Sequence, residues 1–445
     1  MLRKNTTIPI LSGIALSTLL LSACSSGSSS SGPAGDGNDA DITIELVSAN
    51  AIGDSAQGAQ MVGANHASLS GAGAGGAMDT SGELITFHGG GIDYNAATGY
   101  MEVFVRDMDA TDLDVEHVSL GPDDEEHSAF AGYSLRPVLS GDGNTVAFYS
   151  TGFSNVDAIH AQIYVRDLNA EQTVVASVIH NSGNPGDAGS RFPNLDNAGK
   201  LVVFESEADL LNGGTHDNEP GMPFPAQQIY LRDLENDETV LISRDATDDS
   251  EPGTGRSEYA DISGNGEYVV FESRAGNLLQ DVDGDHHSVF IYTVDDGTLA
   301  HISVDVQGDA LETDASRPAI SDDGERVVFR TSSALYLWKR GQGTEKVLNG
   351  SITDPALSGN GRYVAFQDTE PNNGQIYRLD LDSDDDPIRI SHAHDGSTPD
   401  EDCEHPVISE DGSIIAFDSS ATNLIGGSHD HGDSSDTYRA VIDNS

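Results

Sequence analysis

The chain has 445 residues, of which 74 are Asp or Glu and only 21 are Lys or Arg, so its formal net charge is −53. This balance argues against nucleic acid as a partner, because binding to phosphates requires a basic surface. The acidity has two interpretations: a solubility device for a saline environment, where salt screens self-repulsion, or a set of cation-binding loops.

The first residues have the pattern of an export signal. Arg3 and Lys4 precede an apolar stretch over residues 8–21, which is too short and too interrupted by Ser and Thr for a membrane span. Residues 21–24, Leu-Ser-Ala-Cys, resemble the lipobox of bacterial lipoproteins. The resemblance implies cleavage before Cys24 and a lipid attached to that cysteine.

The lipobox resemblance also implies a cell-envelope location. Ser25 after the cysteine favours the outer membrane, facing the periplasm or the surface. The alternative is an ordinary secretory signal that is cleaved near Ala23.

We predict three parts: a lipoprotein signal peptide over residues 1–23, a flexible tether over 24–40 and a folded body over 41–445. The tether is built from Ser, Gly, Pro, Ala, Asp and Asn and buries too little apolar surface to offset its ordering entropy. The second cysteine, Cys403, has no partner once Cys24 is lipidated, so we expect no internal disulfide.

A hairpin unit recurs seven times in the folded body. Each copy has Ser or Asp three residues before a Gly and Phe five residues after it: 79–87, 140–148, 196–204, 263–271, 321–329, 358–366 and 409–417. Most copies have Asp-Gly or Asn-Gly, which suits a tight hairpin turn. The apolar run after each turn has the length of a strand.

Two further landmarks follow each hairpin. An aromatic residue stands in a third short strand: Phe104, Tyr164, Tyr230, Phe290, Tyr336, Tyr377 and Tyr438. A fourth strand then ends in Ser in most units, as at Ser177 and Ser243. Four strands per repeat indicate a β-propeller. We interpret the Arg of the recurring Tyr-x-Arg-Asp as structural, in an ion pair or a strand pair.

The two ends of the chain complement each other. The last unit stops after its third strand at residues 438–441, and residues 42–48 supply a strand with the same Val-Ser ending as the fourth strands. We therefore predict an all-β fold, a seven-bladed β-propeller of four-stranded antiparallel blades. Its ring is closed by the N-terminal strand, which completes the last blade and removes the open edges.

Units such as 318–329, followed by an Ile-Tyr-x-x-Asp strand, resemble the WD-like repeats of TolB-type propellers. The resemblance covers nearly all of residues 41–445 and implies the fold. A role in the Tol system does not transfer, because the sequence has no room for the extra α/β domain of TolB. The sequence also has no Gly-x-Ser-x-Gly elbow of the propeller peptidases.

Strand order predicts which face acts. The tight Asp-Gly hairpins lie on one face of an antiparallel blade, and the longer connections, such as 205–226, 272–287 and 418–435, lie on the other. Function tends to lie on long loops that a rigid scaffold holds, so we predict an acidic working face made of these loops.

One acidic loop is a candidate metal site. Asp281, Asp283 and Asp285 alternate in a way that suits Ca²⁺. Tyr292 stands where an EF-hand has its acidic twelfth position, and Asp also favours turns for its own reasons. Ca²⁺ is therefore a candidate cofactor, although no cofactor is certain.

Histidines provide two further candidates. His429, His431 and Asp433 have the ligand types for a transition metal, whereas the alternative is a polar loop with titrating histidines. The segments 392–394, His-Ala-His, and 403–405, Cys-Glu-His, form the other candidate.

Two classes of function follow from these features. The main expectation is a non-catalytic, monomeric cell-envelope lipoprotein that presents the propeller as a scaffold for a protein or glycan partner, held to the membrane through Cys24. The alternative is a metal-dependent propeller enzyme, a lyase or hydrolase acting on polysaccharide. The histidine pairs suggest it by analogy with propeller lyases that act on pectin fragments. The sequence assigns no catalytic residue, and no basic residues in it form a pattern suited to an anionic sugar.

Overall fold

The computed structural model describes most of the folded body. The described residues are 41–52, 60–63, 65–68, 77–90, 101–110, 115–121, 132–151, 160–213, 226–248, 250–280, 282, 284–305, 307–370, 373–426 and 435–443. Cys24 and the predicted signal and tether lie outside this part of the chain.

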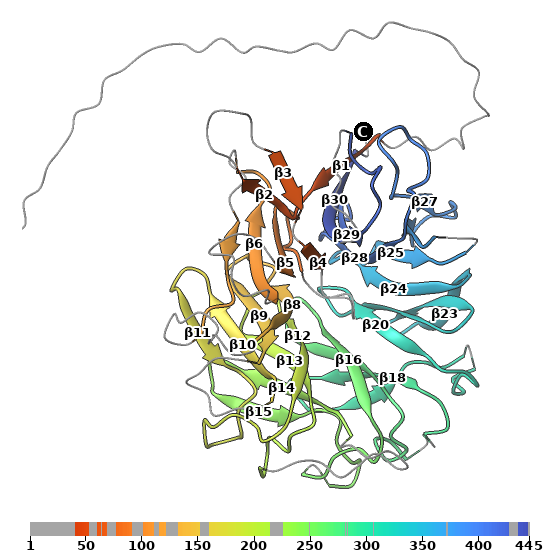
Figure 1. Ribbon diagram of the computed structural model, residues 1–445. Helices are drawn as coiled ribbons and strands as arrows, with labels where there is room; N and C mark the ends of the chain where they lie inside the picture. The colour runs from red at the N-terminus through yellow and green to blue at the C-terminus, as the bar shows by residue number, and fades with distance from the viewer. Residues whose placement is uncertain are drawn as a thin grey trace, which may run out of the picture. The chain divides into compact units, whose positions relative to one another are not determined.

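Seven four-stranded antiparallel sheets are arranged around a central axis (Figure 1). The first three are β4 (Asn65–Ser68), β5 (Leu84–Gly90), β6 (Met101–Asp107) and β7 (Glu116–His117); β8 (Ser134–Leu139), β9 (Thr145–Ser150), β10 (Gln162–Asp167) and β11 (Gln172–Val175); and β12 (Ser190–Leu195), β13 (Leu201–Ser206), β14 (Gln228–Asp233) and β15 (Glu238–Leu241). They form blades 1 to 3.

Blades 4 to 7 continue in chain order. They are β16 (Ser257–Ile262), β17 (Tyr268–Ser273), β18 (Ser288–Thr293) and β19 (Leu299–His301); β20 (Ser316–Ile320), β21 (Arg326–Arg330), β22 (Ala334–Lys339) and β23 (Gly343–Asn349); β24 (Ile352–Leu357), β25 (Tyr363–Asp368), β26 (Gln375–Asp380) and β27 (Ile388–Arg389); and β28 (Cys403–Ile408), β29 (Ile414–Ser419), β30 (Asp436–Asp443) and β1 (Asp41–Leu46). An additional hairpin pairs β2 (Ala49–Ile52) with β3 (Gln60–Gly63). The predicted all-β, seven-bladed propeller is confirmed. No stretch of the described residues forms a helix that could cross a membrane.

The N-terminal strand closes the ring, as predicted. It pairs antiparallel with β30 from Asp41 opposite Asp443 to Leu46 opposite Tyr438. Arg439 Nε lies 2.7 Å from Glu45 Oε2, and Arg106 Nη1 of blade 1 donates to the carbonyl of Val47 at 2.8 Å. The first contact lies within the last blade, and the second joins the first blade to the last.

Each blade has an aromatic pair at its centre. The Phe of the second strand stacks on an aromatic ring of the third strand in all seven blades, with ring centroids 5.5–6.2 Å apart. The seven phenylalanines are buried: Phe87, Phe148, Phe204, Phe271, Phe329, Phe366 and Phe417. The two landmarks of the repeat are therefore one packing unit.

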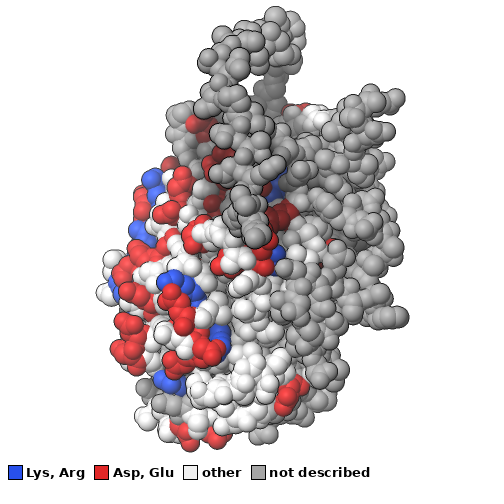
Figure 2. All heavy atoms as spheres, turned by 90° about the vertical axis from the view of Figure 1, so that its left-hand side faces the viewer, with Lys and Arg blue, Asp and Glu red and all other residues white. Residues whose placement is uncertain are grey.

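The negative charge is displayed on the outside of the ring. On the face drawn in Figure 2, acidic side chains outnumber basic ones across the described surface. Many of these Asp residues are in turns, where they accept backbone N–H bonds within two to five residues, as Asp233 does from Asn236.

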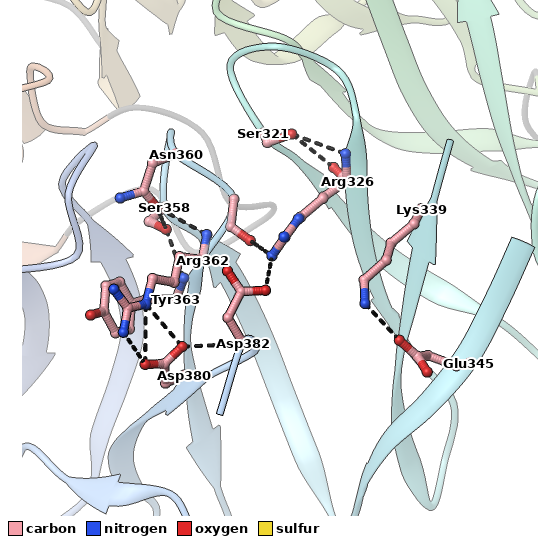
Figure 3. A network of polar contacts seen from close by, with 11 residues as sticks. Ser321, Arg326, Lys339, Glu345, Ser358, Asn360, Arg362, Tyr363, Asp380 and Asp382 are labelled. Atoms are coloured by element: carbon pink, nitrogen blue, oxygen red, sulfur yellow. Dashed lines mark hydrogen bonds and ion pairs between the residues drawn. The ribbon is translucent and has the colours of Figure 1, made fainter. Parts of the chain in front are cut away.

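The tight hairpins explain the Ser-x-Asn/Asp-Gly pattern. In blade 6, Ser358 Oγ donates to Asn360 Oδ1 at 2.8 Å and accepts from the Tyr363 N–H at 2.9 Å (Figure 3). The Arg362 N–H also donates to Asn360, and Gly361 has a φ of 70°, which glycine adopts at little cost. The side chains therefore satisfy the backbone of the turn.

A closed circle of backbone hydrogen bonds links the hairpins of all seven blades. The bonds are Thr80 to Gly141, Asp142 to Asn197, Asn197 to Gly264, Asn265 to Asp322, Asp322 to Gly359, Asn360 to Glu410 and Glu410 to Thr80, at 2.9–3.1 Å. Inside the circle, Asn197 Nδ2 donates to Asp322 Oδ2 at 2.8 Å. A Cβ added at Gly264 would overlap the Asn197 side chain and lie 2.6 Å from Asp322 Cγ, so glycine is required at this close approach.

We expect Gly264→Ala to destabilise the fold by about 1–3 kcal/mol, because the crowded side chains lie inside a closed ring and have little room to move. Urea unfolding measures the effect. The matched control is Gly189→Ala, where the nearest atom to the added Cβ is 3.7 Å away on a flexible Arg191. Equal midpoints for the two variants would contradict this account of the ring.

Candidate functional site

The innermost strands of the blades build the candidate site. The first strand of each blade lies at the inner edge of its sheet, and the first strands of neighbouring blades, such as β12, β16 and β20, contact one another around the axis (Figure 1). Each first strand starts at the end of the ring with the long connections and runs towards its tight hairpin, as the antiparallel pairing predicts.

Six of these strands have a β-bulge with a left-handed residue near their start. We call these residues the channel ring: Arg136, Phe192, Tyr259, Arg317, Asp354 and His405, with φ of 45–54°. All six are half-buried. A bulge redirects a side chain, and a positive φ costs a residue other than glycine about 1–3 kcal/mol. Because strained residues often lie at functional sites, this level of the six blades is the candidate functional site.

The cationic and aromatic members of the channel ring are stacked in blade order. The Arg136 guanidinium lies 4.7 Å from the centre of the Phe192 ring, and Phe192 lies 6.3 Å from Tyr259. The Arg317 guanidinium lies 3.9 Å from the centre of the Tyr259 ring. Two arginines therefore enclose two aromatic rings, an arrangement that stabilises each cation and fixes the plane of its fork.

The other members of the ring are an acid and a histidine. Arg317 Nη1 lies 3.1 Å from Asp354 Oδ1, and His405 Nδ1 lies 3.4 Å from the buried Asp418. Burial lowers the pKa of His405, but Asp418 first and then Asp354 and Glu404 outweigh it, so the pKa lies above the usual histidine value. A histidine poised in this way, with a carboxylate behind it, is suited to proton transfer.

A buried polar layer supports the channel ring. The residue after the blade Phe is polar and at most 9 % exposed in six of the seven blades: His88, Tyr149, Glu205, Glu272, Gln367 and Asp418. Glu205 accepts the N–H of Tyr259 at 2.8 Å, and Glu272 accepts the N–H of Arg317 at 2.7 Å. In these two blades the layer therefore anchors the left-handed residue of the next blade.

A small cavity of about 70 Å³ lies at the hairpin ends of the innermost strands, lined in part by Asp79, Asn197, Asp261, Asp322 and Glu410. Burial raises the pKa of Asp261 to about 7, although the N–H groups of Ile320 and Ile262 oppose this shift. Both carboxyl oxygens of Asp261 accept hydrogen bonds from protein groups. This end is therefore narrow, and the protein's own polar groups occupy it.

The predicted metal ligands are not tested by the described residues. Asp281, Asp283, His429, His431 and Asp433 lie outside this part of the chain. Asp285 is described and exposed. Within the described ranges, no three His, Cys, Asp or Glu residues lie together as metal ligands would.

The residues of the other histidine candidate, 392–394 and 403–405, lie in different surroundings. His392 Nε2 contacts the carbonyl of Arg389 at 2.6 Å, and His394 Nδ1 contacts the carbonyl of Asn423 at 3.0 Å. Cys403 is buried in blade 7 and is a free cysteine. Only His405 joins the channel ring.

The channel-ring residues share a constant spacing in the sequence, although their residue types differ. Every member stands seven residues before the hairpin glycine of its blade, and five of the six precede a proline. Because the residue type at this position differs from blade to blade, the position does not appear as a repeated motif in the sequence. The bulges also bring two basic residues, Arg136 and Arg317, into one ring, which their spacing along the chain does not reveal.

The chain matches no protein-family model and no curated protein. Among solved structures it is similar to an oligogalacturonate lyase from Vibrio parahaemolyticus, with 12 % identity, 91 % of this chain and 98 % of that chain covered, and a TM-score of 0.52. A further oligogalacturonate lyase, in complex with manganese, has 13 % identity over 91 % of this chain and 97 % of that chain, with a TM-score of 0.52. TolB from Acinetobacter baumannii covers 65 % of this chain and 59 % of its own length at 17 % identity and a TM-score of 0.38.

The chain is a β-propeller, and similarity at this level of identity concerns the fold alone. The fold that the TolB-type resemblance implied is confirmed by the strand pairing of the chain itself, which forms a seven-bladed propeller. The main functional expectation, a non-catalytic scaffold, was wrong. The propellers similar to it over 91 % of its length are lyases, which agrees better with the alternative of an enzyme acting on polysaccharide.

We expect Cys403 to be inert in the native protein, because burial raises the pKa of its thiol to about 12 and only the thiolate is a good nucleophile. Its hydrogen bonds with Ser419 and Ser391 oppose this shift without cancelling it. Titration with a thiol reagent is the measurement, on a Cys24→Ser chain so that one thiol is counted. Reaction is expected only after unfolding, and prompt reaction of the native chain would contradict this burial.

Proposed function

We propose that the chain is an enzyme that cleaves acidic oligosaccharides, with the channel ring as its active site. The observation that carries the proposal is the stack of Arg136, Phe192, Tyr259 and Arg317 beside the His405–Asp418 pair. The similarity to oligogalacturonate lyases supports the choice of substrate class.

The stack has the groups that a uronic acid sugar requires. The guanidinium forks suit carboxylates, which they bind through paired N–H groups. Arg136 Nη1 is buried without a hydrogen-bond partner among the described residues, a costly state that a substrate carboxylate would relieve. Phe192 and Tyr259 hold the two guanidinium groups in place through cation–π contacts.

The reaction that these groups support is an elimination. A base removes the proton from the carbon that bears the carboxylate. The electron pair of that C–H bond forms a double bond to the neighbouring carbon, whose C–O bond to the leaving sugar breaks, and the oxygen of the leaving sugar takes up a proton from water. Arg136 and Arg317 stabilise the negative charge that develops on the carboxylate, and His405 in its neutral form accepts the proton. Asp418 orients the imidazole and stabilises it once it is protonated.

Manganese is the metal of one similar structure. The described residues do not form a set of ligands for it, since none of their His, Cys, Asp and Glu residues gather in threes. No step of the reaction above is therefore assigned to a metal.

We expect His405→Asn to lower kcat on trigalacturonate by about 10²–10⁴-fold, because it removes the proton acceptor. In the wild-type chain, kcat should rise with pH through the raised pKa of His405, since the neutral imidazole is the base, and this limb should vanish in the variant. Arg136→Gln should raise KM by about 10–100-fold through the loss of a charged hydrogen bond. Absorbance of the unsaturated product measures each rate.

The matched control for these variants is His394→Ala, which removes an exposed histidine that bonds to the carbonyl of Asn423. It should retain wild-type activity. A folded wild-type chain that forms no unsaturated product, with or without added manganese, would contradict the proposed reaction.

We also propose that this enzyme acts at the cell envelope, anchored by lipid on Cys24. The support is the apolar leader with its Leu-Ser-Ala-Cys ending. Several acyl chains on one cysteine give stable anchoring, because each buried CH₂ contributes about 0.8 kcal/mol.

We expect the full chain produced in a Gram-negative host to incorporate labelled palmitate and to fractionate with membranes. Cys24→Ala should abolish the label. Incorporation that persists in this variant, or its absence from the wild-type chain, would contradict lipidation at Cys24.

A further inference from the structure

Glu205 is a buried acid behind the channel ring to which the proposed reaction assigns no role. It follows Phe204 in β13 and is only 1 % exposed. Its Oε1 accepts the N–H of Tyr259 from the next blade at 2.8 Å. Its Oε2 is buried and has no hydrogen-bond partner among the described residues. One oxygen therefore holds the strained backbone of a channel-ring residue while the other is unused.

The charged groups around Glu205 come from several elements. Glu258 and Glu272, on β16 and β17, disfavour its negative charge, whereas Arg256, which precedes β16, favours it. Arg136 of β8 interacts with it electrostatically, as does Tyr259. Arg191 is its cross-strand partner on β12. Burial is the largest influence and, together with Glu258, raises the pKa of Glu205 to about 8, against the opposing N–H of Tyr259.

We propose that Glu205 is a positioning residue that works as a neutral carboxylic acid, fixing Tyr259 in the channel ring without adding a negative charge beside Arg136. The neutral form still accepts the Tyr259 N–H through its carbonyl oxygen. The ionised form would place a buried carboxylate next to the cationic stack, where low dielectric strengthens its effect. The ring therefore keeps its attraction for anions only while Glu205 retains its proton.

The role of Glu205 in substrate affinity rests on the proposed acidic-sugar site, but its protonation is independent of any ligand. A carboxyl whose pKa is raised in the folded state binds more protons folded than unfolded. Its effect on stability therefore becomes less favourable as pH rises from the unfolded pKa to the folded pKa, and is constant above that. Glu205→Gln keeps the acceptor oxygen and removes the titration.

The first experiment compares melting temperatures of wild type and Glu205→Gln from about pH 5 to about pH 9. We expect the variant to gain on the wild type as pH rises and the difference to level off near pH 8, the pKa of Glu205. The control is Glu238→Gln, which replaces an exposed glutamate of β15 in the same blade, and its melting curve should follow the wild type across the pH range. A difference between Glu205→Gln and wild type that does not change with pH overturns the inference.

The second experiment measures trigalacturonate binding by calorimetry across the same pH range. Wild type should lose about 10-fold or more in affinity above the pKa of Glu205, and Glu205→Gln should retain its affinity. A wild-type affinity that is flat with pH overturns the positioning role. If no chain binds trigalacturonate at any pH, the proposed substrate is wrong, and the stability comparison still decides the state of Glu205.

If Glu205→Gln does not fold, carbon-13 NMR of wild type labelled at its glutamate carboxyls replaces it. One buried glutamate resonance titrating near pH 8 supports the inference. Titration of all glutamates in the ordinary range overturns it.

Discussion

The candidate site depends on the closed circle of hydrogen bonds at the hairpin end. Seven backbone bonds join the hairpins into one closed circle, and the pairing of β1 with β30 completes the last blade. Since each bond fixes one innermost strand against the next, the bulges near the opposite ends of these strands are held at a common level. A channel ring of six separate strands exists only because none of them can shift alone.

The same constraint accounts for the strain in the ring. Six left-handed residues, five of them before a proline, run against local preference, because proline favours an extended conformation in the preceding residue. Local preference would relax each bulge if the backbone N–H groups exposed by it were left to water. In blades 4 and 5 the N–H groups of Tyr259 and Arg317 are instead bound by buried acids of the preceding blade, Glu205 and Glu272. These hydrogen bonds maintain the distortion of the backbone. The polar residue after each blade Phe is thus part of the site rather than a flaw in the core.

This arrangement explains why the fold could be predicted from the sequence and the site could not. The fold depends on residues that repeat: the hairpin glycine, the blade Phe and its aromatic partner perform the same task in every blade and therefore recur in phase. The site depends on residues that differ between blades, since Arg136, Tyr259 and His405 share a position but not a chemistry. The spacing to the hairpin glycine specifies where each residue stands in its blade. These residues come together in space only because the blades close into a ring. The residues that cluster along the chain lie in acidic and histidine-rich loops, and they predicted metal sites in those loops instead.

The acidic surface and the cationic stack are compatible for an electrostatic reason. The outer carboxylates act through water and salt, which screen charges over about 8 Å at physiological ionic strength. Arg136 and Arg317 are half-buried against aromatic rings, where the dielectric is lower and a carboxylate that reaches them is bound at close range. For the anionic substrate that we propose, the surface would oppose long-range attraction, while the channel ring would keep a short-range attraction. High salt weakens the first effect more than the second, so a propeller of this charge is expected to capture acidic sugars more readily in a saline environment than in dilute buffer.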